Sequence, residues 1–144
     1  WLWAIGVMCE IGVFFIMPWL MRRFSLKYIL IFSFLCAILR FVLIGQCIEW
    51  PVIIVFAQVL HAATYGAHHV SAMIVIHHFF RGRHQAKGQA IYTCMAYGVG
   101  GALGAVSSGY TWDWLGADTT FLISAAAAFA GLMLIVLKMK ASDQ

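Results

Sequence analysis

Charged residues are scarce in this sequence. Lys, Arg, Asp and Glu make up 10% of its 144 residues, whereas hydrophobic residues make up 64%. A soluble domain is typically about a quarter charged and half apolar, because polar side chains must cover its surface. The low proportion of charge therefore excludes an ordinary soluble domain and predicts an all-α protein that crosses a membrane several times.

Motifs that define several other protein classes are also missing. The four cysteines form no C-x-x-C pair, which argues against a disulfide framework and against a zinc site. No H-E-x-x-H or G-x-S-x-G sequence occurs, so we do not expect an enzyme. The net charge of +4 comes from short basic clusters between apolar runs, a distribution that does not favour a nucleic-acid partner.

Histidines are concentrated in one apolar run, since five of the six lie between Gln58 and Phe80. No second run offers a histidine to complete a pair of axial ligands, so neither haem nor another metal cofactor is expected. At helical spacing Gln58, His61, Tyr65 and His68 share one face. We interpret this face as the lining of a polar cavity.

Five apolar runs in the single unit of residues 1–144 are long enough to cross a bilayer. The third is roughly 45 Å long against a hydrocarbon core of about 30 Å, so we expect it to tilt, protrude or bend near Gly66. The predicted bundle has five transmembrane helices, at about residues 1–20, 28–47, 51–80, 89–110 and 119–137.

Basic connectors predict the orientation of the chain. The connectors after the first, third and fifth runs carry Lys and Arg, whereas the opposite connectors carry acidic residues and no Lys or Arg. By the positive-inside rule the basic side and the carboxyl terminus are cytoplasmic. The basic residues concerned are Arg22, Arg23, Lys27, Arg81, Arg83, Lys87, Lys138 and Lys140, and the acidic ones are Glu49, Asp113 and Asp118.

The chain begins at Trp1 inside an apolar run, and from this we expect a fragment of a longer protein. One preceding span would make six, with both ends of the bundle on the cytoplasmic side.

Three ionisable residues are predicted to lie near the middle of the membrane. Counted along a helix, Glu10 and Arg40 are roughly 15 and 18 Å from the cytoplasmic ends of their spans, and His61 is about 15 Å from the outer end of its span. Such groups are costly in hydrocarbon and normally face a partner or water. We expect Arg40 to pair with Glu10, either to couple protons to transport or only to fix helix packing. His61 either titrates with them or is a neutral hydrogen-bond donor.

The fourth span contains a run of glycines. Gly98, Gly100, Gly101 and Gly104 fail as a dinucleotide fingerprint, because no strand precedes them and the third glycine is misplaced. They indicate a close helix-packing face, or alternatively a hinge. Tyr92, upstream on the same span, is a candidate to line the central cavity.

Several segments resemble the carboxyl-terminal half of a major facilitator superfamily transporter, in its phenylpropionic acid permease-like branch. They are W-x-x-G-V-x-x-E-I around Glu10, I-L-R-F at Arg40, Q-V-L-H-A at residues 58–62 and G-Q-A-I-Y at residues 88–92. The resemblance implies helices eight to twelve of twelve, with an amino-terminal half that completes the transporter.

This resemblance also implies proton-coupled symport of a small solute across the cytoplasmic membrane. In the related lactose permease, helix ten carries a His-x-x-Glu sequence, but the position three beyond His61 is Thr64. Either Glu10 carries the proton instead, or the amino-terminal half does. An aromatic carboxylate suits Arg40, and a sugar or nucleoside fits nearly as well. The alternative is a non-transporting bundle that stabilises a partner complex.

Overall fold

The computed structural model describes residues 1–139, so Lys140 lies outside the described residues. In that range helices are joined by short connectors. Two of the helical segments have π geometry and one is a short 3-10 turn. In chain order the elements are α1 (Leu2–Arg23), α2 (Leu26–Gln46), α3 (Pro51–Ala62), η1 (Ala63–Ala67), α4 (His68–Phe79), η2 (Gly82–His84), α5 (Gln85–Thr93), η3 (Cys94–Val99) and α6 (Gly100–Lys138).

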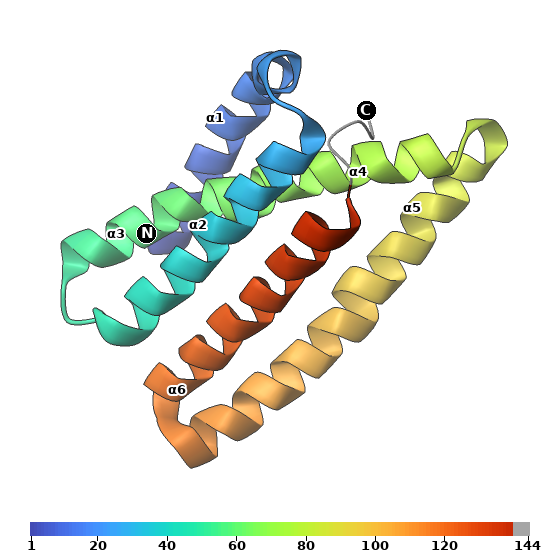
Figure 1. Cartoon of the computed structure of the whole chain (residues 1–144). Helices are drawn as coiled ribbons and strands as arrows, with labels where there is room; N and C mark the ends of the chain where they lie inside the picture. Colours follow the sequence, from blue (N-terminus) through green and yellow to red (C-terminus); the bar gives the residue numbers. More distant parts are fainter. Residues whose placement is uncertain (140–144) are drawn as a thin grey trace.

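Four helical stretches are long and apolar enough to cross a membrane: Leu2–Arg23, Leu26–Gln46, Pro51–Phe79 and Gly82–Lys138. The last has 57 residues, far more than a bilayer needs. It reverses direction at Gly116, whose φ of 82° is a left-handed value that favours glycine (Figure 1). We expected a connector over residues 111–118, but helix continues through most of it and a single residue makes the turn.

The two legs of this stretch have different surroundings. The second leg, residues 117–138, lies beside α2 (Figure 1), and Gly131 packs so closely on the ring of Phe34 that a Cβ would overlap it. We call residues 85–115, which form the first leg, the arm. Side chains of residues 93–110 in the arm are exposed. The arm is therefore covered much less by this chain than the second leg is.

The other helix pairs form a small core. Helix α1 packs mainly on α3 and η1, and touches α2 little. Met17, Ile29 and Ala67 form the buried cluster where α1, α2 and η1 meet. Many large apolar side chains stay exposed around the bundle, which is what a lipid-facing surface requires.

A π-turn interrupts the third span around Gly66, where we expected a bend. It widens the helix over Ala63–Ala67, and a wider turn leaves carbonyl groups without their α-helical partners. Ser33 of α2 donates its hydroxyl to one of them, the carbonyl of Ala63, at 2.9 Å, and lies 3.4 Å from the carbonyl of Thr64. Packing against α2 thus stabilises a helix geometry that is rare on its own.

The connectors that carry Lys and Arg gather at one end of the bundle. The α1–α2 connector, the α4–α5 turn and the end of α6 lie toward the same side of the bundle in Figure 1, whereas the α2–α3 connector and the turn at Gly116 lie toward the opposite side. Trp50 and Trp112 are exposed near that opposite end, as expected of interfacial aromatic side chains. The arrangement agrees with the alternation of basic and acidic connectors in the sequence.

Candidate functional site

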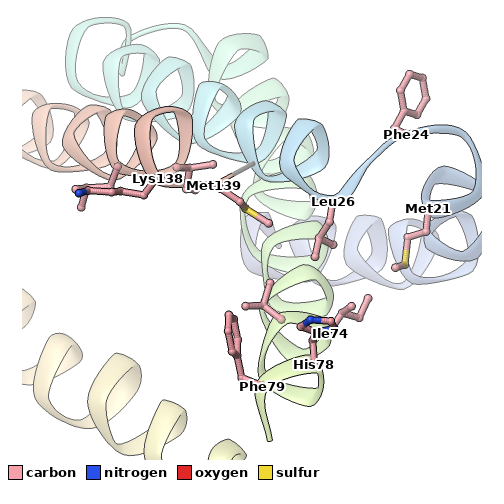
Figure 2. Close-up of a pocket in the computed structure, with 11 residues that line it drawn as sticks. Met21, Phe24, Leu26, Ile74, His78, Phe79, Lys138 and Met139 are labelled. Carbon is pink, nitrogen blue, oxygen red and sulfur yellow. The ribbon is translucent and has the colours of Figure 1, made fainter. Parts of the chain in front are cut away.

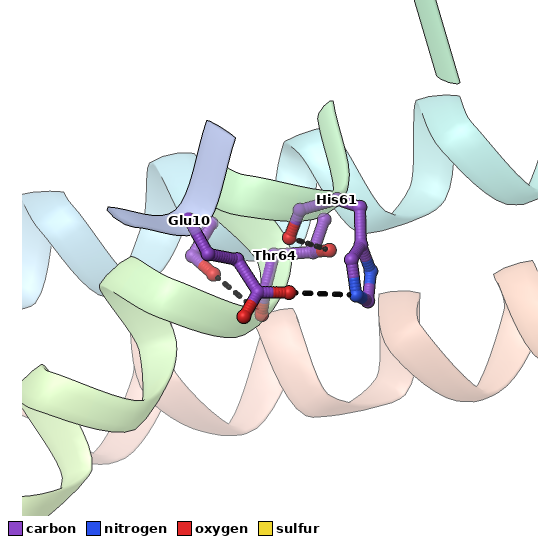
Figure 3. A network of polar contacts seen from close by, with 4 residues as sticks. Glu10, His61 and Thr64 are labelled. Carbon is purple, nitrogen blue, oxygen red and sulfur yellow. Dashed lines mark hydrogen bonds and ion pairs between the residues drawn. The ribbon is translucent and has the colours of Figure 1, made fainter. Parts of the chain in front are cut away.

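Glu10 and His61 form a carboxylate–imidazole pair between α1 and α3. Oε1 of Glu10 lies 2.9 Å from Nε2 of His61, and the two side chains are 13% and 26% exposed (Figure 3). Because water screens such a pair little, a proton gained or lost here changes the local field strongly. The two residues therefore form one protonatable unit rather than two separate groups.

A glycine on α1 lets the two helices meet at this pair. Gly6 lies one turn before Glu10 on α1, and a Cβ at Gly6 would lie 3.3 Å from His61 Cδ2 and 3.4 Å from Gln58 Oε1. Thr64 donates its hydroxyl to the carbonyl of His61 at 2.9 Å (Figure 3). Gln58 thus lies next to the pair, as its place on the predicted polar face requires.

Arg40 does not form the expected ion pair with Glu10. Among the described residues the side-chain partner of Glu10 is His61, because α1 packs on α3 rather than on α2. Equal depth in the membrane could not reveal this, since contact also depends on how each helix is rotated. Arg40 is half-buried, its Cζ lies 5.8 Å from the centre of the Phe41 ring, and its buried Nε has no hydrogen-bond partner.

The π-turn changes which histidine follows Tyr65 along the polar face. The ring of Tyr65 stacks between His61, at a centroid distance of 5.8 Å, and His69, at 6.1 Å. His68, which we expected on this face, instead packs edge-on against Phe34 at 5.4 Å. A π-turn advances each residue by a smaller angle than an α-turn, so the face passes to the next residue along the chain.

Two tyrosines of the arm complete this aromatic face. Tyr97 lies 6.4 Å from the ring of Tyr65, and its hydroxyl is 3.2 Å from Nδ1 of His69. Tyr92, a predicted cavity residue, contacts Tyr97 edge-on at 6.1 Å. The sequence placed Tyr97, like Tyr92, within reach of a central cavity, but it did not indicate His69 as a site residue. Tyr97 lies in the second π-turn, η3, and no pattern of apolar residues marks either π-turn.

The predicted glycine packing face is open in the described chain. A Cβ at Gly98, Gly101 or Gly104 would meet nothing within 4 Å, and one at Gly100 would meet only the carbonyl of Met95 in the preceding turn. Close helix packing occurs instead at other glycines, including Gly6 and Gly131. Whether the first set packs on a further helix stays a prediction.

Two cavities lie outside this cluster. One of about 690 Å³ opens at the basic end of the bundle, where apolar side chains such as Phe79 surround it, with His78 and Lys138 as its basic residues (Figure 2). The other, of about 390 Å³, lies between α2, α4 and the second leg, and His68 lines it. Neither is lined by Glu10 or His61. Within residues 1–139 no group of three or more His, Cys, Asp or Glu side chains is arranged to hold a metal ion.

Apolar helices long enough to cross a membrane, with a partly buried carboxylate–imidazole pair between two of them, are typical of multi-pass membrane proteins with a polar site between the spans. Residues 1–123 match the MFS_1 like family. The chain belongs to this family, within the major facilitator superfamily and its phenylpropionic acid permease-like branch. The resemblance inferred from short sequence segments is thereby confirmed.

The chain is also similar to a named transporter. The probable 3-phenylpropionic acid transporter of Escherichia coli (strain K12) is 31% identical over 133 residues, which cover 92% of this chain and 34% of the relative. The chain thus spans about a third of the length of the relative it matches. No solved structure matches this chain significantly.

Proposed function

We propose that the chain forms part of a proton-coupled symporter that carries a small organic solute across the cytoplasmic (inner) membrane. The observation that carries this proposal is the partly buried Glu10–His61 pair, because an ionisable pair within a span is costly and usually functional. Membership in a family of transporters supports transport rather than a bundle that only stabilises a partner.

The pair is suited to bind and release one proton. When Glu10 is ionised, neutral His61 donates its Nε2 hydrogen to Oε1. When Glu10 is protonated, its hydroxyl donates to Nε2 instead, so a hydrogen bond at 2.9 Å is possible in both states. One added proton therefore changes the charge of the pair by one unit without breaking the contact, and Arg40 lies close enough to experience that change.

Arg40 is the proposed binding partner for an anionic substrate. The Nε of Arg40 has no hydrogen-bond partner and can donate to a carboxylate. An arginine binds a carboxylate through two parallel hydrogen bonds. The aromatic face of His61, Tyr65, His69 and Tyr97 suits a flat ring beside that carboxylate. The name of the relative, a probable 3-phenylpropionic acid transporter, motivates an aromatic carboxylate as the substrate.

Proton binding and substrate binding are coupled if both ligands favour the same conformations of the permease. A proton on the pair lowers the net negative charge near Arg40 and so makes a second anion, the substrate carboxylate, more favourable there. We place the two legs of residues 82–138 in the membrane as separate spans, which gives five spans. In this proposal the sequence beyond this chain supplies the amino-terminal half and the other wall of the cavity.

The proposal is tested by Glu10→Gln in the complete permease reconstituted in vesicles. Gln keeps the size of the side chain and removes the proton site. We expect uphill accumulation of radiolabelled phenylpropionate to be lost while exchange of internal for external substrate persists. The matched control is Glu49→Gln, the same substitution at an exposed carboxylate, which should leave both activities unchanged. Normal accumulation by Glu10→Gln would contradict the proposal.

A further inference from the structure

Two histidines of α4 contact the arm at equivalent positions. His69 Nδ1 lies 3.2 Å from the hydroxyl of Tyr97, and His77 Nε2 lies 2.7 Å from Nε2 of Gln89. The histidines are eight residues apart, and so are their partners, in the reverse order along the chain. Both contacts thus specify the same antiparallel register between α4 and the arm.

Neighbouring contacts agree with that register. Gly88 packs so closely against Phe80 that a Cβ would lie 2.6 Å from the phenyl ring, which fixes the end of the helix pair at the α4–α5 turn. Beyond Tyr97 the exposed arm offers little further contact to hold it. Gly82 and Gly116, the residues of positive φ in the described chain, lie at either end of the arm. The arm is therefore held on one side by α4 and is bounded by two turns.

We propose that His69 and His77 are positioning residues that fix the register of the arm on α4 and thereby hold Tyr97 beside Tyr65. A shift of the arm by one residue would rotate the Tyr97 side chain by about 100° away from the aromatic face. The substrate would then meet an incomplete surface. The transport part of this inference rests on the proposed function, whereas its structural part does not.

In this proposal His69 and His77 act through their contacts with the arm. The hydroxyl of Tyr97 can donate to a neutral imidazole or accept from a protonated one. The amide of Gln89 donates to His77 as placed, and after a flip its oxygen would accept instead. Because both partners can adapt, amide side chains that present a polar atom at the same place should substitute for the imidazoles: Asn for Nδ1 of His69 and Gln for Nε2 of His77.

The register is tested by cross-linking in the membrane-embedded protein, with its native cysteines replaced. Met73 and Thr93 lie midway between the two contacts on their helices, so Met73→Cys should cross-link to Thr93→Cys in preference to Ala90→Cys, one turn away. Adding His69→Phe and His77→Phe together should abolish that preference, and His69→Asn with His77→Gln should restore it. An unchanged preference in the double Phe variant would overturn the inference.

Substrate kinetics test the consequence for the site. Each Phe variant should raise KM about two- to tenfold, the range that corresponds to one hydrogen bond, with little change in maximal rate. His77→Gln, at the contact outside the aromatic face, should keep a KM near that of the unmodified protein and the same pH profile. A KM for His77→Gln as high as that for His77→Phe would show that the imidazole itself is needed and would overturn the inference. If cross-linking follows the prediction but transport is not coupled to protons, the proposed function fails and the positioning role stands.

Discussion

The Glu10–His61 pair should contribute measurably to the stability of the bundle. We consider Glu10→Met and His61→Phe, which are of similar size and remove the polar groups, together with the double variant. A hydrogen bond to a charged group stabilises a protein by about 1.5–3 kcal/mol, and each single variant also leaves one buried polar group without a partner. With only 13% and 26% of the side chains exposed, little of this contribution is lost to solvent.

The expected result is a coupling free energy of about 1.5–3 kcal/mol, so that the double variant is less destabilised than the sum of the single ones. The assay is equilibrium unfolding of the purified protein in mixed micelles, followed by the change in helical circular dichroism. Glu49→Met at an exposed position is the control and should change the free energy of unfolding little. Additive effects, within about 0.5 kcal/mol, would refute the assignment of these residues as a pair.

Two further predictions concern packing and exposure. Gly131→Leu should destabilise the bundle by about 1–3 kcal/mol, because the added side chain overlaps Phe34. Gly104→Leu should be tolerated, because nothing lies within 4 Å of a Cβ there. Equal destabilisation of the two variants in unfolding experiments would contradict the packing described. Tyr65→Cys, at a position 42% exposed, should react with a membrane-impermeant thiol reagent, and Ser71→Cys, at a position 0% exposed, should not. The reverse order of labelling would exclude this arrangement of the third span.

The sequence predicted the helical spans well, because their signal is local. Long apolar runs separated by charged connectors are enough to place α1 and α2 within a few residues of their ends. The exception is the connector before residue 119, where polar residues such as Asp113 suggested a loop. A helix can continue through a polar stretch at the membrane surface, and a single glycine at position 116 suffices for the reversal.

The candidate site was predicted only in part, because its geometry depends on rotation and packing. The residues Glu10 and His61 stood out as ionisable groups in apolar runs, but the partner of Glu10 was not evident from depth alone. The replacement of His68 by His69 on the polar face depends on the π-turn, which Ser33 stabilises from another helix. Such a contact has no signature within the span that it alters.

The most direct test of proton coupling is the uptake of protons driven by the substrate itself. Phenylpropionate is added to lightly buffered, de-energised vesicles that contain the complete permease, and the external pH is recorded. The unmodified protein should make the medium more alkaline as protons enter with the substrate, and Glu10→Gln should give no such change while it still binds phenylpropionate. Alkalinisation of equal size in Glu10→Gln would contradict the assignment of the Glu10–His61 pair as the proton site.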